Sequence, residues 1–294
     1  MEELISVVIP VYNRAHLVGR TLRSIESQTV QPKAVILVDN NSTDDSLNVL
    51  KQWAAGRTNV EVISERKPGA ACARNAGLAR VQTPYVMFFD SDDRMPPFHI
   101  EEVGAGLRAA GLPEIAEFAS VLVNEDGPNI YARLRRGDAL KNHIFHSTLA
   151  TQRYVVKTDL VRRVGGWNEQ LLGWDDLELG VRLLVACPKP AQIVPTLPVL
   201  VNVHSDSITG TDFASKAGQW ERALDCCERA LEGDRYHRRL INYRRAILAG
   251  FYRRENCPEL ARGLVRSPWM NLIASYVAAG GRGVSKFAIV EKFL

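Results

Sequence analysis

Long apolar runs and C-x-x-C pairs are missing from this 294-residue sequence, and a secretory leader is not expected. No stretch of about 18 or more consecutive apolar residues occurs, so a membrane-spanning helix is not expected. The five cysteines are odd in number and scattered, and none forms a C-x-x-C pair. This pattern argues against a zinc ribbon or a disulfide scaffold and favours a reducing compartment. The acidic start Met1-Glu2-Glu3-Leu4 is unlike a secretory signal, so we predict a cytoplasmic protein.

The composition is that of a soluble globular enzyme, with 46% hydrophobic and 24% charged residues. Its charge is unevenly distributed along the chain. From residue 211 onward there are 15 Lys and Arg against 9 Asp and Glu, whereas the first 210 residues hold 22 against 24. Long amphipathic helical patterns also begin near residue 210. We therefore predict one domain over residues 1–210 and a helical C-terminal extension over residues 211–294.

Short apolar runs alternate with helical patterns through the first ninety residues. The runs predicted as buried strands are 4–10, 34–39, 60–63 and 86–89. This alternation predicts an α/β fold, with a mostly parallel sheet flanked by helices on both faces. Beyond residue 110 the pattern is less regular. The candidate strands there are 115–123, 154–156 and 192–194.

Three of the predicted strands end in polar clusters. The clusters are Pro10-Val11-Tyr12-Asn13, Asp39-Asn40-Asn41 and Asp90-Ser91-Asp92-Asp93. Because ligands of parallel sheets bind beyond the carboxyl ends of the strands, we expect these clusters to converge at one edge. Asn13 is also expected to cap the helix that follows it.

The aspartate cluster at residues 90–93 is the strongest single feature. A hydrophobic strand brings two carboxylates, one residue apart, to the edge of the sheet. Mg²⁺ and Mn²⁺ prefer carboxylate oxygens and commonly bridge to the phosphates of a nucleotide. An aspartate-rich turn without such a role has the same pattern, so both interpretations stay open.

A second acidic segment, Gly173-Trp174-Asp175-Asp176, precedes a helical pattern. Asp176 is expected at the beginning of that helix, where backbone N–H groups stabilise a carboxylate. A simple helix cap explains the segment equally well. Shielded by Trp167 or Trp174, the same carboxylate would have a raised pKa and serve as a general base.

Two further features have a functional and a structural interpretation. Residues 69–78 form a small-residue helix in which Arg74 is suited to a phosphate or a base, and close helix packing is the alternative. His204 follows a strand-like run and is a candidate metal ligand or diphosphate contact. A structural histidine is equally compatible with that position.

In their order along the chain, these clusters closely resemble the family 2 glycosyltransferases. The resemblance covers roughly residues 4–210, and its first ninety residues are the most specific. It is carried by the three strand-end clusters, Arg74-Asn75-Ala76-Gly77, Gly165-Gly166-Trp167-Asn168-Glu169 and Asp175-Asp176 with Arg182. It implies a GT-A fold with a Rossmann-like nucleotide-binding half and a reaction that inverts the anomeric centre.

The resemblance also implies roles for individual residues. Asp176 would be the catalytic base and Asp92 the metal ligand. The nucleotide-binding residues would be Pro10, Val11, Tyr12, Asn13, Asp39, Asn41, Arg74, Asp90 and Ser91. The residues on the acceptor and sugar side would be Trp167, Asn168, Glu169, Trp174 and Asp175. The sequence departs from the family at Asp175, where Glu is common, and at Asn40, where Asp is frequent.

The implied function is a metal-dependent inverting glycosyltransferase of the hexosyltransferase type. It would use Mn²⁺ or Mg²⁺ and a nucleoside-diphosphate sugar, with UDP as the expected carrier. The acceptor would be a hydroxyl group of a saccharide or a lipid-linked saccharide, in polysaccharide or lipid-linked oligosaccharide assembly. Because a Gln-x-x-Arg-Trp motif is missing, one sugar per encounter is expected. No nucleic-acid partner is expected.

Two alternative functions fit the sequence less well. A sugar-phosphate nucleotidyltransferase needs a glycine-rich loop after the first strand, and residues 11–15 contain no glycine. A non-catalytic binding subunit is disfavoured because Asp39, Asp90, Asp92 and Asp176 are all retained.

The basic C-terminal region has three open interpretations. Trp269, Met270, Ile273 and Tyr276 lie close together, and Arg282, Lys286 and Lys292 follow. This combination is compatible with a peripheral contact to an anionic membrane, at its cytoplasmic face. A helical cap or a homodimer contact is at least as compatible with the same residues.

Overall fold

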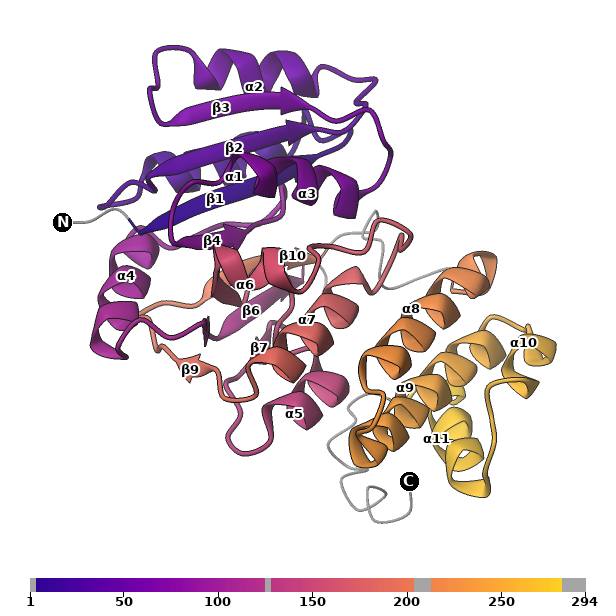
Figure 1. The fold of residues 1–294 in the computed structure, drawn as a ribbon. Helices are drawn as coiled ribbons and strands as arrows, with labels where there is room; N and C mark the ends of the chain where they lie inside the picture. Colours follow the sequence, from indigo (N-terminus) through magenta and orange to yellow (C-terminus); the bar gives the residue numbers. More distant parts are fainter. Residues whose placement is uncertain (1–3, 125–127, 204–212, 282–294) are drawn as a thin grey trace. The chain divides into compact units, whose positions relative to one another are not determined.

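The computed structural model describes residues 4–124, 128–203 and 213–281 (Figure 1). The chain forms two compact units that are interleaved in sequence. The first comprises Met1–Arg136, Thr148–Leu172 and Lys189–His204, and the second comprises Gly137–Ser147, Gly173–Pro188 and Ser205–Leu294. A domain boundary near residue 210 stays a prediction.

The first unit contains two β-sheets. The larger sheet has the strand order β3-β2-β1-β4-β8-β5-β9, and the smaller sheet has the order β10-β6-β7. The strands of the larger sheet are β1 (Ile5–Val11), β2 (Ala34–Asp39), β3 (Val60–Ser64), β4 (Tyr85–Phe88), β5 (Ile115–Glu117), β8 (Tyr154–Lys157) and β9 (Ala191–Gln192). Those of the smaller sheet are β6 (Ser120–Asn124), β7 (Ile130–Ala132) and β10 (Val199–Val203).

Helices complete the first unit and make up most of the second. In the first unit they are α1 (Val18–Glu26), α2 (Ser46–Ala54), α3 (Ala70–Arg80), α4 (His99–Ala109) and α6 (Thr158–Arg163). In the second they are α5 (Ala139–His146), α7 (Asp175–Ala186), the 3₁₀ helix η1 (Ala214–Lys216), α8 (Ala217–Ala230), α9 (Arg235–Arg254), α10 (Pro258–Arg262) and α11 (Pro268–Ala278). The expected C-terminal helices are confirmed, and α5 and α7 belong to the same unit as these helices.

Strand register brings the polar strand ends together. β1 runs parallel to β2 on one side and to β4 on the other, with Val11 opposite Asp39 and Val8 opposite Phe88. Only β8 runs antiparallel to its neighbours in the larger sheet of the described residues. The predicted mostly parallel sheet is confirmed. The carboxyl ends of β1, β2 and β4 therefore lie at one edge.

The central strands are buried on both faces. Alternate residues of a strand point to opposite sides, so one side of β1 packs into a cluster with α1, α2 and α4. Val8 and Val38 point to the other side, against Gly77 of α3. Helices thus cover the two faces, and the edge beyond the carboxyl ends is left for polar side chains.

The structure differs from the expected strands beyond residue 110. The apolar run 115–123 is not one strand, because β5 pairs with β8 in the larger sheet whereas β6 pairs with β10 in the smaller one. The strand expected at 192–194 is β9, which ends at Gln192. An apolar run indicates burial, but it does not indicate which strand will be its partner.

Helix α9 is the centre of the second unit, where it contacts α5, α8, α10 and α11 (Figure 1). Met270 and Ile273 of α11 are buried against Tyr243 and Ile247 of α9. Met270 and Ile273 therefore do not form an exposed surface with Trp269, whereas a peripheral membrane contact of this region stays a prediction. Within the described residues, no helix has both the length and the apolar character needed to cross a membrane.

Gly77→Ala is expected to destabilise the first unit, because the new Cβ would lie 2.3 Å from Cγ1 of Val8 and 3.2 Å from Cγ2 of Val38. Overpacking of this kind costs about 1–3 kcal/mol. Gly104→Ala in α4 is the matched control, since its nearest neighbour would be Nη2 of Arg108 at 3.7 Å. The control should gain up to about 1 kcal/mol from helix propensity. Urea unfolding measures both variants, and equal stabilities would contradict the close packing of α3.

Candidate active site

Hydrogen bonds from Asn13 and Arg14 join the loops that follow β1 and β2. Asn13 has a left-handed backbone with φ 49°, which asparagine tolerates. Its side-chain oxygen accepts a bond from the amide of Thr43 at 2.8 Å, and its own amide donates to Oγ of Ser42 at 3.1 Å. The amide of Arg14 donates to Oγ of Ser46 at 2.8 Å. The amide of Asn40 also donates to the carbonyl of Val11 at 2.8 Å, so two of the three polar clusters meet.

The expected capping role of Asn13 is wrong. Helix α1 begins at Val18, and Leu17 before it makes no side-chain capping bond. The Asn13 side chain is engaged between the two loops instead. Tyr12, the preceding residue, is exposed at the end of β1.

Asp39 is a buried carboxylate at the end of β2, with only 4% of its surface exposed. Among the described residues, its Oδ1 atom has no hydrogen-bond partner. A buried acceptor without a partner costs roughly 1–3 kcal/mol, and a ligand that donates a hydrogen bond would remove this cost. The atom is therefore suited to an N–H or O–H group of a nucleotide.

Asn40 fixes the segment between β3 and α3. Its side-chain nitrogen donates to the backbone oxygens of Glu65 and Lys67, at 2.9 and 2.8 Å. Its side-chain oxygen accepts a bond from the amide of Gly69 at 2.8 Å. An aspartate cannot make the two donated bonds. Asparagine at this position therefore has a structural reason in this chain.

Arg74 of α3 lies between an aromatic ring and a carboxylate. Its guanidinium carbon is 4.4 Å from the ring centroid of Trp167, and Nη2 donates to Oδ1 of Asp90 at 2.8 Å. The Trp167 ring packs edge-on against Phe88 of β4, with centroids 5.1 Å apart. Because Arg74 is buried, Asp90 compensates a charge that has little access to water.

Asn75 holds the backbone of the loop that contains Trp167. Its side chain accepts from the Trp167 amide and donates to the Trp167 carbonyl, both at 2.9 Å. Gly166 has φ 70°, and a Cβ there would lie 2.7 Å from Oδ1 of Asn75, so this position requires glycine. Asn75 also donates to Oε1 of Glu169 at 2.9 Å. A hydrogen bond from Lys67 lowers the pKa of Glu169, which favours its ionised form.

The aspartate turn after β4 is held by one residue just before β8 and one in β10. Gln152, just before β8, donates to Oδ2 of Asp90 at 2.5 Å and also to Oδ2 of Asp93. Asn202 of β10 donates its amide to Oδ1 of Asp93 at 2.8 Å and its side-chain nitrogen to the carbonyl of Asp92. Burial raises the pKa of Asp93 well above its ordinary value, and the charges of Asp90 and Asp92 raise it further.

The turn suits a divalent cation. The side chains of Asp90 and Asp92 are 30% and 20% exposed, and Oδ2 of Asp92 lies 3.9 Å from Nε of Arg14. In the part of the chain that the structure describes, no three His, Cys, Asp or Glu side chains are grouped to hold a metal ion. Mg²⁺ at nucleotide sites commonly uses one or two carboxylates, with waters and phosphate oxygens as the other ligands. The negative charge that raises the pKa of Asp93 fits such a cation.

Asp176 lies in the second unit, at the second position of α7. Its Oδ1 accepts a hydrogen bond from the amide of Leu177 at 2.8 Å. Asp175 is the first residue of the helix, and Trp174 before it has a left-handed backbone with φ 53°. The prediction that Asp176 begins a helix is confirmed, whereas its role as a base stays a prediction.

The other predicted site residues have these environments. Pro10 and Val11 are part of β1, and Ser91 is buried in the aspartate turn. Asn41 has a left-handed backbone with φ 60° and donates to the carbonyl of Arg66 at 2.8 Å. Asn168 accepts a bond from the amide of the residue two positions later. His204 lies outside the described residues, so its role as a metal ligand stays a prediction.

Sequence reasoning missed three residues of the aspartate network. Gln152, Asn202 and Arg14 all contact the turn, yet none was a candidate. The signal that the sequence offers is a polar residue beside or within an apolar run. Gln152 precedes a buried strand, and Asn202 interrupts a run of valines. Only the sheet pairings show that these polar residues face the aspartates.

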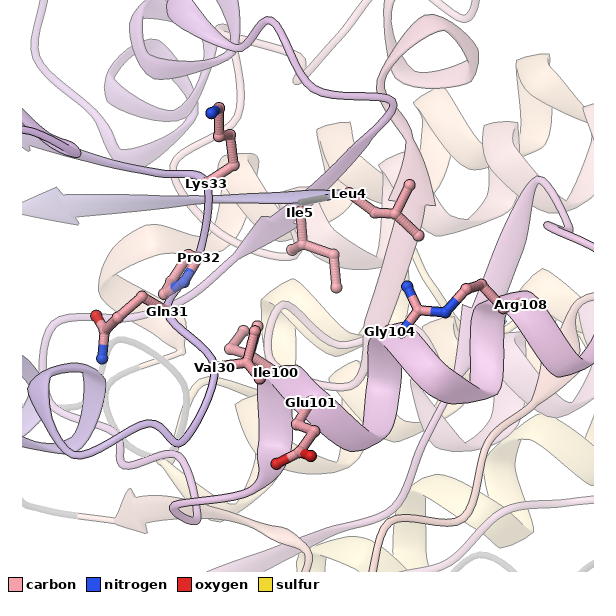
Figure 2. Close-up of a pocket in the computed structure, with 10 residues that line it drawn as sticks. All are labelled: Leu4, Ile5, Val30, Gln31, Pro32, Lys33, Ile100, Glu101, Gly104 and Arg108. Atoms are coloured by element: carbon pink, nitrogen blue, oxygen red, sulfur yellow. The ribbon is translucent and has the colours of Figure 1, made fainter. Parts of the chain in front are cut away.

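A pocket lies at the opposite end of β1 (Figure 2). Leu4 and Ile5, at the start of the strand, line it together with Ile100 of α4, and Lys33 and Arg108 also lie around it. The polar clusters follow the carboxyl ends of the strands. The pocket is therefore separate from the candidate active site.

Comparisons with known proteins agree with this arrangement. The family model described as Glycosyl transferase family 2 matches residues 6–155. Glycosyltransferase GlyG of Streptococcus pneumoniae is 39% identical over 94 residues, which cover 32% of this chain and 31% of the relative. The putative teichuronic acid biosynthesis glycosyltransferase TuaG of Bacillus subtilis is 36% identical over 100 residues, covering 34% and 40%. These matches span less than half the length of each relative.

Solved structures resemble the whole chain. S. aureus TarS 1–349 in complex with UDP has a TM-score of 0.66 and 17% identity, covering 98% of this chain and 90% of that one. The mannosyltransferase PcManGT from Pyrobaculum calidifontis, in complex with GDP-Man and Mn²⁺, has a TM-score of 0.54 and 17% identity, covering 98% and 79%. At these identities the likeness concerns the fold, which is of the GT-A type, as predicted.

Asn40→Asp is expected to lower the free energy of unfolding by about 2–4 kcal/mol. The variant loses two donated bonds and adds a carboxylate beside the buried Asp39. Asn41→Asp is the matched control, because Asn41 is exposed and donates only to Arg66 in the described structure. Guanidinium unfolding should show a loss below about 1 kcal/mol for the control. Equal losses in the two variants would show that Asn40 has no special structural role.

Proposed function

The chain belongs to glycosyl transferase family 2, and we propose that it is a metal-dependent, inverting enzyme that adds single sugars to a hydroxyl group. The observation that carries the proposal is the edge of the larger sheet. There Oδ1 of Asp39, which has no partner among the described residues, lies at the end of β2, and the braced aspartate turn follows β4, on the other side of β1. A nucleoside diphosphate requires a hydrogen-bond acceptor for its nucleobase and carboxylates for the cation that accompanies its phosphates. This edge of the sheet offers both.

UDP is the proposed carrier. Oδ1 of Asp39 is suited to accept the N3–H of uracil, and Pro10, Val11, Tyr12, Asn13 and Asn41 surround the same strand ends. Arg74, Asp90 and Ser91 would lie toward the ribose and phosphates. The structural neighbour TarS in complex with UDP supports this carrier, whereas PcManGT was solved with GDP-Man.

Asp92 and Asp90 would hold Mn²⁺ or Mg²⁺, with His204 as a further candidate ligand. The bound cation would neutralise negative charge on the diphosphate leaving group. Gln152 and Asn202 would keep the carboxylates in place, because their hydrogen bonds brace the turn from the segment before β8 and from β10. Such bracing lowers the reorganisation needed when charge develops during the reaction.

Asp176 is the proposed general base. Its carboxylate would take the proton of the acceptor hydroxyl while the hydroxyl oxygen forms a bond to the anomeric carbon. The bond from that carbon to the diphosphate breaks on the opposite face, so the configuration inverts. Trp167, Asn168, Glu169, Trp174 and Asp175 would lie on the acceptor and sugar side. The proposed setting is polysaccharide or lipid-linked oligosaccharide assembly in the cytoplasm, in line with the name of TuaG.

Asp92→Asn and Asp176→Asn should separate nucleotide binding from transfer. Asp92→Asn is expected to lose the Mn²⁺-dependent stabilisation by UDP, which a thermal-shift assay detects. For the wild type this stabilisation is about 2.7 kcal/mol at a hundredfold excess of UDP over Kd. Asp176→Asn should keep that shift and lose roughly 10²–10⁴-fold in the transfer rate. Asp159→Asn is the control, because this α6 carboxylate has an 88% exposed side chain. A panel of UDP- and GDP-sugars with Mn²⁺ or Mg²⁺ provides the assay.

Each alternative function has its own outcome in the same assay. Unchanged turnover in both variants would refute the proposed mechanism. Pyrophosphate release from a nucleoside triphosphate and a sugar phosphate would identify a nucleotidyltransferase. A folded protein that binds no nucleotide with either cation would instead be a binding subunit.

We further propose that α11 makes a peripheral contact with anionic membranes. Trp269 and Leu272 are 38% and 51% exposed on the side of α11 away from its buried face. Arg262 and Arg266 are exposed just before this helix. An apolar pair beside cations suits the interface of an anionic bilayer.

The double variant Trp269→Ser/Leu272→Ser should bind anionic vesicles at least about tenfold more weakly, because it removes the apolar part of the contact. Val194→Ser is the control, since Val194 is an 82% exposed apolar residue of the other unit. Co-sedimentation with phosphatidylglycerol and phosphatidylcholine vesicles measures the effect. Equal binding by both variants would refute the membrane contact. A change from dimer to monomer in the double variant would identify a dimer contact instead.

A further inference from the structure

The turn just before the helix that carries Asp176 has a strained backbone. Trp174 is the N-cap of α7, with φ 53° and ψ 26°. A bulky side chain rarely adopts this left-handed conformation, which persists only where the surroundings enforce it. The residues that hold Trp174 in this conformation therefore also influence the position of Asp176, two residues later.

An aromatic cluster from the C-terminal helices encloses the turn. Trp220 of α8 lies 5.3 Å from Trp174 between ring centroids, and 5.2 Å from Phe213. Phe213 stacks on Phe251 of α9 at 4.3 Å. A Cβ at Gly173 would lie 2.2 Å from the ring of Trp220, so the glycine lets the backbone lie directly on the indole. The cluster leaves little freedom to the turn.

Arg244 of α9 completes this enclosure. Its Nε donates to the carbonyl of Ile144 and its Nη2 to Oγ of Ser147 at 2.7 Å, both at the end of α5. Its guanidinium carbon lies 5.9 Å from the ring centroid of Trp174. Burial lowers the pKa of Arg244, and the negative charge of Asp176 is among the groups that oppose this effect.

We propose that Arg244 is a positioning residue for Asp176, so that α8 and α9 form part of the catalytic apparatus rather than a separable appendage. The proposal rests on the function proposed above, in which Asp176 is the general base. Arg244 acts through two links. It ties the end of α5 to the Trp174 turn, and its positive charge attracts the carboxylate of Asp176.

The positive charge of Arg244 predicts a specific change in the pH dependence of kcat. The groups around the start of α7 are Asp175 and Glu178 on the helix itself, Arg244 from α9, and His143 and Cys227 from α5 and α8. A nearby cation favours the ionised form of a carboxylate, as do the N–H groups of a helix start. Without the Arg244 charge, the pKa of the base would rise. Because the base must be deprotonated, the acid limb of the kcat profile would then move to higher pH.

Arg244→Gln, Arg244→Lys and Arg238→Gln test the proposal in the full chain. Arg238 is an exposed arginine of the same helix and is the matched control. Arg244→Gln is expected to lower kcat by about 10²-fold, the scale of a misplacement near 1 Å, with the KM for the sugar donor unchanged. Its acid limb should shift upward. Arg244→Lys keeps the charge, so it should keep the wild-type acid limb and recover part of kcat. Arg238→Gln should match the wild type.

The outcomes distinguish positioning from a purely structural role. A folded Arg244→Gln with the kcat and acid limb of Arg238→Gln would overturn the proposal. If Arg244→Gln does not fold by circular dichroism, Arg244→Lys decides, and an unchanged kcat in that variant would also overturn it. Asp176→Asn separates this inference from the proposed function. If that variant keeps full transfer, the base assignment itself fails, whereas its inactivity beside an active Arg244→Gln refutes only the role of Arg244.

Discussion

Mutual repulsion among three carboxylates at the end of β4 is the constraint on which the candidate site depends. Asp90, Asp92 and Asp93 lie within four residues, and Asp93 is buried among their charges. The turn is stabilised by donors from separate elements: the guanidinium of Arg74 in α3, the side-chain amide of Gln152 just before β8, and the backbone and side-chain amides of Asn202 in β10. A bound cation would be a further compensating charge. The site therefore requires the register of both sheets.

In the first unit, residues that are consecutive in the sequence connect different parts of the candidate site. Arg74 contacts Asp90 and the Trp167 ring, whereas Asn75 beside it holds the Trp167 backbone. Likewise Gln152 braces the aspartates, and the side chain of Arg153 donates to backbone carbonyls of the β7 segment. Helix α3 thereby connects the aspartate turn with the loop of the predicted acceptor side, and the residues just before β8 connect that turn with the β7 segment, as a preorganised site requires.

Much of this arrangement could be predicted from local patterns. Apolar runs closed by polar residues indicated the ends of β1, β2 and β4, and an acidic pair before a helical pattern indicated the start of α7. The run at 115–123 misled because burial looks the same in two sheets, while its halves pair with different strands. The prediction that Asn13 caps the following helix was wrong for a similar reason. A short polar side chain before a helix suits a cap, but the amide of Thr43 in the next loop is its actual partner.

The sequence by itself determined the α/β class, the parallel sheet and the polar strand ends, because hydrophobic period and turn chemistry are local properties of the chain. Only the tertiary structure decided which groups meet. It paired Gln152 and Asn202 with the aspartates, left Oδ1 of Asp39 without a partner in the described residues, and enclosed Trp174 between Trp220 and Arg244. The physical reason is distance along the chain. Contacts between residues 40 to 110 positions apart depend on strand order and helix packing, and neither leaves a trace in a local pattern.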